Sequence, residues 1–162
     1  MEQPAQRTSI VYFIEARGSG GFLSHKIGIA SVPGPDKRNA HERAARNRMA
    51  SMQTGCPMPL ELIGTADAIL LAMALGWSGR DDRSAALHAE RFIHGFLSDE
   101  CTHGEWHAGP KTEALIGAVR KRGMNTRVQV LCRIVDILRP HKNIELGAWV
   151  ENQPLMLKQL RA

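Results

Sequence analysis

The sequence predicts an α+β fold in which a small, mixed or antiparallel three-stranded sheet is flanked by helices. Short β-branched and aromatic runs stand at residues 10–14, 25–29 and 60–64, as is typical of strands. Stretches of helical length and periodicity lie between and after them, giving the order β-β-α-β-α with further helices. The 162 residues, 43% hydrophobic and 23% charged, are enough to bury one core without disulfides or metals.

The first two strands are expected to pair as a hairpin. Residues 10–14 and 25–29 are separated by the turn-forming run Gly-Ser-Gly-Gly at 18–21. Val-Pro-Gly-Pro at 32–35 then interrupts the chain, and a polar, alanine-rich stretch from Asp36 to about Gln53 predicts a helix. Thr54 and Gly55 end this helix, and two prolines prevent its continuation into the third strand.

Helices dominate the rest of the chain. An apolar stretch at 66–77, an amphipathic one at 84–97 and a third from Pro110 to about Arg122 are all expected to be helical. The pattern at 128–138 fits either a strand or a helix, because its apolar residues alternate and also recur at helical spacing.

Charge and cysteine content narrow the classes of protein. The net charge is +5, which admits a nucleic-acid partner without requiring one. Basic residues concentrate at 37–48, five against one acidic, and at 111–142, eight against two. The three cysteines contain no Cys-x-x-Cys pair, and the longest apolar run, 68–77, is too short to span a bilayer. We therefore expect a cytoplasmic protein with no membrane partner.

Two charges fall on helix faces that otherwise look core-facing. At about 100° per residue, Glu90 lies among Ala86, Leu87, Ile93 and Leu97, and Arg48 lies among Ala44, Ala45 and Met52. An isolated buried carboxylate is costly, so Glu90 needs a partner, a metal ion or water. Either the two residues form a buried ion pair, or both line one cleft, with Arg48 on a phosphate and Glu90 on a metal.

Four short motifs, in this order, resemble those of the GIY-YIG nucleases and especially of their phage-type branch. They are Ile-Val-Tyr at 10–12 with Lys-Ile-Gly at 26–28, Arg48 with Gln-Thr-Gly at 53–55 and Pro57, Glu90 with His94, and Gly-Glu-Trp at 104–106. The resemblance implies a nuclease or DNA-binding domain at 9–122, with a probable insertion at 66–83 and a basic C-terminal extension at 123–162. Such domains occur in phages and mobile elements.

The resemblance further implies a DNA endonuclease that hydrolyses phosphodiester bonds with one divalent ion, Mg²⁺ or Mn²⁺. Glu90 would ligate the metal, and Arg48 would donate a forked pair of hydrogen bonds to the scissile phosphate. Tyr12 would orient or deprotonate the attacking water. Lys26 stands where the family has its second tyrosine and would act either as a base or as a phosphate contact.

Other residues take supporting roles in this interpretation. His94 and His25 are candidates to support the site, since each lies near a catalytic candidate in the sequence. DNA contacts are expected from four basic residues of the first helix and its approach, Lys37, Arg38, Arg43 and Arg46. A single-site domain would have to act as a homodimer, or act twice, to cut both strands.

Two other functions remain open on the sequence alone. A DNA-binding module could keep the fold without cutting, which the lysine at position 26 and the lack of a matching asparagine favour. A structural or interaction protein would instead seal Arg48 and Glu90 together as an ion pair. The positions of Arg48 and Glu90 distinguish a sealed ion pair from an open cleft that could bind DNA.

Overall fold

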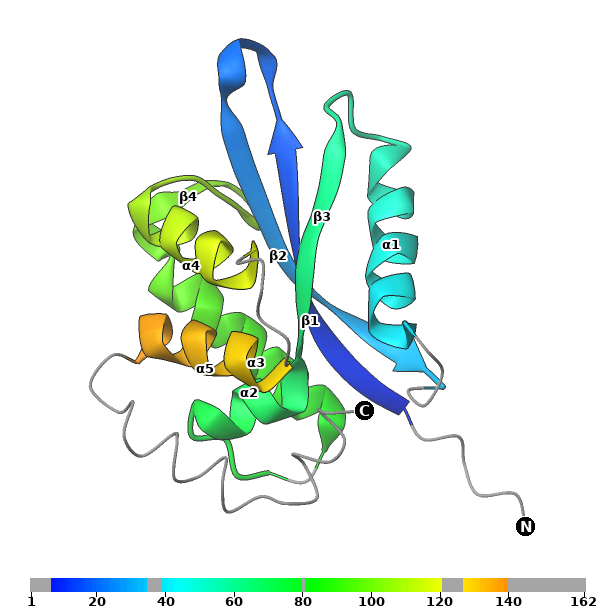
Figure 1. Ribbon diagram of the computed structural model, residues 1–162, viewed down its shortest axis with the longest axis vertical. Helices are drawn as coiled ribbons and strands as arrows, with labels where there is room; N and C mark the ends of the chain where they lie inside the picture. The colour runs from blue at the N-terminus through cyan, green and yellow to red at the C-terminus, as the bar shows by residue number, and fades with distance from the viewer. Residues whose placement is uncertain (1–6, 35–38, 80, 121–126, 140–162) are drawn as a thin grey trace.

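Five antiparallel strands form the centre of the computed structural model, which describes residues 7–34, 39–79, 81–120 and 127–139 (Figure 1). The sheet order is β3-β1-β2-β5-β4. The strands are β1 (Arg7–Arg17), β2 (Leu23–Pro33), β3 (Leu60–Asp67), β4 (Cys101–His103) and β5 (Trp106–His107). The expected hairpin of β1 and β2 is confirmed, and the third expected strand is present and pairs with β1, but the sheet is larger than the three strands predicted.

The central strand β1 is buried on both faces, which explains its continuous apolar run. Ile10, Tyr12 and Ile14 pack on one side, and Val11 and Phe13 pack on the other. Successive strand residues point to opposite faces. A residue directly across from Tyr12 or Ile14 on β2 therefore shares their face of the sheet.

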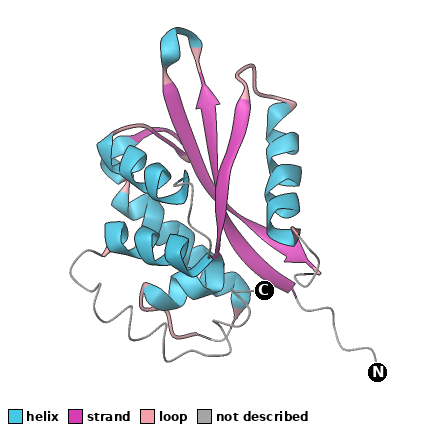
Figure 2. Ribbon diagram, in the orientation of Figure 1, coloured by secondary structure: helices cyan, strands magenta, loops and turns pink. Residues whose placement is uncertain are grey.

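Helices cover both faces of the sheet (Figures 1 and 2). Helix α1 (Ala40–Gln53) packs on the face of Tyr12. The opposite face packs against α2 (Ala68–Ala74), α3 (Asp82–Phe96), α4 (Pro110–Arg120) and α5 (Arg127–Leu138). We call these the α1 face and the α3 face. The segment at 128–138, ambiguous in the sequence, is helical, and its apolar side chains join the same core as α2–α4.

The first helix begins later than the predicted Asp36, at Ala40, after Asn39 in a left-handed conformation. Its far end is fixed by Gln53. The Gln53 side-chain amide donates to the carbonyl oxygens of Cys56 and Met58, and its oxygen accepts from the backbone N–H of Leu60, at 3.0–3.1 Å. These three bonds tie the end of α1 to the start of β3.

A buried carboxylate anchors the edge hairpin of β4 and β5 to α4. Glu100 accepts hydrogen bonds from the backbone N–H groups of Lys111 and Thr112 in the first turn of α4. A carboxylate at a helix N-terminus satisfies free N–H groups and complements the helix dipole. Gly109 leaves room for it, because a Cβ there would lie 2.5 Å from the Glu100 carboxyl carbon.

Candidate functional site

Lys26 and Glu105 form an ion pair on the α1 face of the sheet. The distance from Lys26 Nζ to Glu105 Oε2 is 2.8 Å, and the side chains are 18% and 51% exposed. Strand pairing explains the contact, because Lys26 lies across from Trp106 in the β2–β5 register. Glu105, in the turn just before β5, therefore reaches Lys26 from the next strand.

Glu90 lies beside this pair and is only 16% exposed, in agreement with the helical phase of its sequence. Burial raises the pKa of its carboxyl, and the negative charge of Glu105 raises it further, while His94 and Lys26 oppose the shift. The pKa of Glu105 is lowered instead, first by its hydrogen bond from Lys26. The two carboxylates therefore share one electrostatic environment with Lys26.

Arg48 was expected on the core-facing side of α1, but its side chain is exposed, so that expectation is wrong. The buried stripe of α1 runs through His41 and Ala45, with Met49 and Met52 packed beside it. Arg48 lies about 60° around the helix from Ala45, so its long side chain reaches water at the rim. No ion pair joins Arg48 to Glu90 among the described residues.

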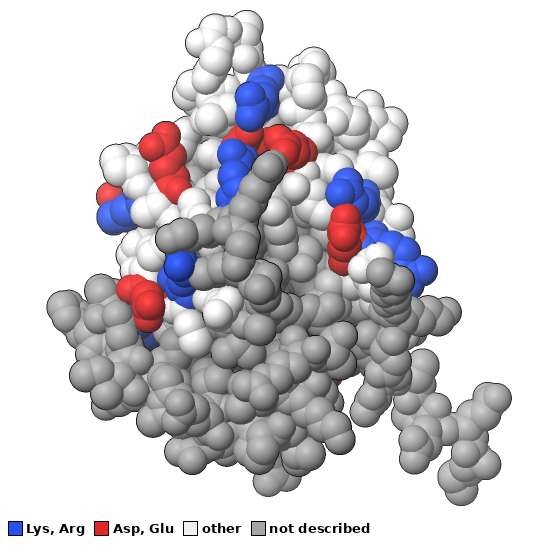
Figure 3. All heavy atoms as spheres, viewed as in Figure 1, with Lys and Arg blue, Asp and Glu red and all other residues white. Residues whose placement is uncertain are grey.

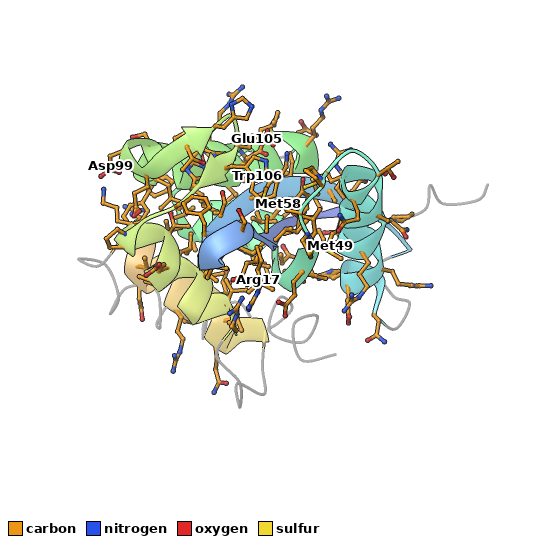
Figure 4. The ribbon with its side chains drawn as sticks, turned by 90° about the horizontal axis from the view of Figure 1, so that it is seen from above. Arg17, Met49, Met58, Asp99, Glu105 and Trp106 are labelled. Atoms are coloured by element: carbon orange, nitrogen blue, oxygen red, sulfur yellow. The ribbon has the colours of Figure 1, made fainter. Side chains whose placement is uncertain are left out.

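The positive charge of Arg48 nevertheless acts on the same group of residues, since it helps to lower the pKa of Glu105. Figure 4, seen from above, labels Glu105 and Trp106 near the β4–β5 hairpin and Met49 near α1. We call Lys26, Arg48, Glu90, His94 and Glu105 the charged cluster. Its members come from β2, α1, α3 and the β4–β5 turn.

His94 joins the charged cluster to a buried histidine, His107. His94 Nδ1 lies 2.8 Å from His107 Nε2, and His107 Nδ1 lies 3.3 Å from the carbonyl oxygen of Leu97. Burial lowers the pKa of His107, and the neighbouring His94 lowers it further, which favours the neutral ring. His94 Nε2 points the other way, is enclosed, and has no hydrogen-bond partner among the described residues. Glu90 Oε1 is 4.0 Å from it.

Tyr12 lies on the α1 face but is almost fully packed, with 2% exposure. It is directly across from Gly28 in the β1–β2 register. A Cβ built on Gly28 would lie 2.3 Å from the Tyr12 hydroxyl oxygen. The glycine of the Lys-Ile-Gly motif therefore makes room for the tyrosine ring to cross β2.

Gly28→Ala is expected to lower the free energy of unfolding by about 1–3 kcal/mol, because the enclosed tyrosine must shift to admit a methyl group. Urea denaturation of both forms measures the difference. Gly117→Ala is the matched control, since it adds the same methyl group to the exposed face of α4 with nothing within 4 Å. That control should be neutral or stabilising. An equal response of the two variants would contradict the close Tyr12–Gly28 packing.

His25 is not brought to the charged cluster. It lies on the α3 face, 3% exposed, with Nε2 2.9 Å from Glu15 Oε2. Its sequence neighbour Lys26 lies on the α1 face, because side chains alternate along a strand. His25 therefore makes its hydrogen bond to Glu15 and lies across from His107 in the β2–β5 register, and its supporting role stays a prediction.

The predicted DNA-contacting residues are only partly described. Arg43 and Arg46 are exposed on α1, and Arg46 forms an ion pair with Glu42 at 2.8 Å. Lys37 and Arg38 lie outside the described residues. On the face seen in Figure 3, basic and acidic side chains of the described residues are interspersed.

Sequence reasoning did not assign Glu105 and His107 to the site. Glu105 was visible in the Gly-Glu-Trp motif, but nothing in its spacing indicated a pairing with Lys26. His107 stands next to that motif, and its contact with His94 depends on how β5 meets α3. Both contacts join segments that the sequence does not place side by side.

The charged cluster offers few protein donors for a divalent ion. Among the described residues, no three His, Cys, Asp or Glu side chains are grouped to hold a metal. Glu90 and His94 do offer one carboxylate oxygen and one enclosed nitrogen without a partner, 4.0 Å apart. Two protein ligands completed by water and phosphate oxygens fit an ion that acts on phosphate. The residues present are therefore compatible with a weakly held catalytic ion.

Comparisons with family models, curated proteins and solved structures find no match to this chain. Within the described ranges, no helix has the length and hydrophobicity required to cross a membrane.

Proposed function

We propose that this protein is a metal-dependent endonuclease that hydrolyses phosphodiester bonds in DNA at a GIY-YIG-type site. One observation carries the proposal. Lys26 and Glu105 form an ion pair, Glu90 of α3 interacts electrostatically with both, and the exposed Arg48 is close enough to act on Glu105, although these residues are far apart in the sequence. The order of β1, β2, α1, β3 and α2 at the start of the chain supports the proposal.

Each residue has a role that follows from its chemistry. The exposed guanidinium of Arg48 would bind two oxygens of the scissile phosphate through its forked N–H groups. Lys26 Nζ is paired with the Glu105 carboxylate at 2.8 Å, which favours a phosphate contact over service as a base. Tyr12 lies on the same face as Lys26, and its hydroxyl would orient the attacking water.

Glu90 would hold the divalent ion, with His94 beside it. An ion bound there would supply positive charge to the leaving oxygen. Partial burial raises the pKa of the Glu90 carboxyl, and a cation bound beside it would favour the ionised form. The exposed Arg43 and Arg46 would add contacts to the DNA backbone, which carry no sequence information.

Nicking of supercoiled plasmid tests the proposal. We expect the wild type to convert supercoiled DNA to open circles with Mg²⁺ or Mn²⁺ and not with EDTA. Arg48→Ala should reduce the rate by about 10²–10³-fold, as for loss of an aligned transition-state donor. The nicking rate of Arg48→Lys should lie between those of the wild type and Arg48→Ala, because lysine keeps the positive charge but lacks the forked N–H groups.

Arg83→Ala is the control for loss of an exposed arginine outside the charged cluster. Its nicking rate should match that of the wild type. Metal-independent nicking, or equal losses from Arg83→Ala and Arg48→Ala, would contradict the proposal.

A non-catalytic DNA-binding module is the second candidate. The near-complete burial of Tyr12 and the prior engagement of Lys26 by Glu105 favour it. This function would give DNA binding that weakens steeply with salt, without nicking under any metal. The third possibility, an Arg48–Glu90 pair sealed in the core, disagrees with the exposure of Arg48.

A further inference from the structure

A chain of three contacts runs from the backbone to the charged cluster. It starts at the carbonyl oxygen of Leu97, passes through His107 and His94, and ends at Glu90. His107 is 2% exposed and His94 is partly buried. The contacts of these rings determine where their protons lie.

The proton positions follow from the partners. A carbonyl oxygen can only accept, so His107 Nδ1 carries a proton directed at Leu97. In a neutral His107, Nε2 is then the acceptor, and His94 Nδ1 must donate to it across 2.8 Å. A neutral His94 therefore leaves a bare lone pair on Nε2. That atom is enclosed, lacks a hydrogen-bond partner, and faces a carboxylate oxygen.

We propose that Glu90 Oε1 and His94 Nε2 together ligate one first-row transition-metal ion, such as Mn²⁺, in preference to Mg²⁺. This inference rests on the proposed function and assigns His94 as a second protein ligand. A cation between two facing acceptor atoms is attracted by both of them. Their 4.0 Å separation is short enough for one ion to contact both atoms at about 2.0–2.2 Å, the usual range for nitrogen and oxygen ligands.

The imidazole nitrogen of His94 favours a transition-metal ion over Mg²⁺. Mg²⁺ prefers oxygen ligands and keeps several waters, whereas imidazole binds transition metals well. His107 also behaves as a positioning residue, because its hydrogen bond to Nδ1 fixes the orientation and proton position of the His94 ring. Such support is common for metal-bound histidines.

Direct Mn²⁺ binding, measured by electron paramagnetic resonance on the full chain without DNA, tests this inference. We expect the wild type to bind one Mn²⁺ ion, and Mg²⁺ to displace it only at concentrations at least about tenfold higher than those of Mn²⁺. Glu90→Gln and His94→Asn should each weaken binding by about tenfold or more. Asparagine is chosen because its amide can replace Nδ1 as donor to His107 while removing Nε2. Circular dichroism confirms that each variant is folded.

His88→Asn is the matched control on the same helix. His88 Nε2 is also enclosed without a partner, but no carboxylate lies within 4.0 Å of it among the described residues. This histidine lines a separate hollow of about 400 Å³ that includes Trp77 and Phe92. Its substitution should leave Mn²⁺ affinity within about twofold of the wild type.

The outcomes separate this inference from the proposed function. Equal affinity of His94→Asn and the wild type would overturn the inference and leave Glu90 as the sole protein ligand. Absence of Mn²⁺ binding would also overturn it, and plasmid nicking would then show whether the nuclease proposal survives. Binding that requires both residues, in a protein that never nicks DNA, would support the inference and overturn the nuclease.

Discussion

Glu90→Gln is expected to reduce metal-dependent plasmid nicking by at least about a hundredfold. The substitution preserves size and removes the negative charge that would hold the divalent ion. Metal stabilisation of a transition state is worth several kcal/mol, and about 1.4 kcal/mol corresponds to a factor of ten in rate. DNA binding should persist or strengthen, since a carboxylate near phosphate is lost. Initial nicking rates and salt-dependent binding, measured on the same samples, give the two quantities.

Glu113→Gln provides the comparison for Glu90, because it removes an exposed carboxylate from the first turn of α4. Its nicking rate should equal that of the wild type. If Glu90→Gln still nicked DNA at the wild-type rate, Glu90 would have no part in metal binding for catalysis. If both variants lost activity equally, the effect would reflect general charge rather than the site.

Glu15→Gln is expected to lower the free energy of unfolding at pH 7 by about 2–4 kcal/mol. Glu15 is 1% exposed on the α3 face and accepts hydrogen bonds from His25 at 2.9 Å and Arg120 at 2.6 Å. Hydrogen bonds to a buried charged group contribute about 1.5–3 kcal/mol each before loss of partners is counted. The Arg120 contact also fastens α4 to β1.

The effect of Glu15 should depend on pH in a defined direction. Burial alone would raise its pKa, but the hydrogen bonds from His25 and Arg120 outweigh burial and lower the pKa below 4.5. The ionised form therefore stabilises the fold above about pH 4.5, and this contribution is lost as the pH falls through the lowered value. Urea denaturation of wild type and Glu15→Gln should show a smaller difference at low pH than at pH 7.

Glu61→Gln is the control for Glu15, since Glu61 lies across from it on β3 and is exposed. Its unfolding free energy should change by no more than about 0.5 kcal/mol. A difference for Glu15→Gln that did not shrink at low pH would show that its charge does not stabilise the fold.

The sequence was informative wherever local periodicity decides structure. The hairpin of β1 and β2, the strand at Leu60, and α1, α3 and α4 were all predicted near their observed positions. The half-burial of Glu90 also followed from helical phase. These features depend on residues that are close together in the sequence, so the local pattern of apolar side chains predicts them.

The features that the sequence did not predict depend on contacts between segments that are distant in the sequence. Strands β4 and β5 are three and two residues long, too short to give a pattern, and β5 is a strand because it pairs with β2. Arg48 was placed on the wrong face because the buried stripe of α1 is set by how the helix docks on the sheet. The direction of His25 toward the α3 face could not be predicted either, because it depends on strand register, which a one-residue shift reverses.

The β4–β5 hairpin, which carries Glu105 of the charged cluster, is held to the sheet by fewer strand pairs than the central strands are. Strand β5 shares two register pairs with β2, whereas β1 and β2 share eleven. Local unfolding follows such differences, so the edge opens at lower free energy than the central strands. Opening it would release Lys26 from Glu105 and would also break the contact of His107 with His94. The ion pair and the buried histidine pair are therefore coupled through one short strand, so that loosening of either is expected to loosen the other.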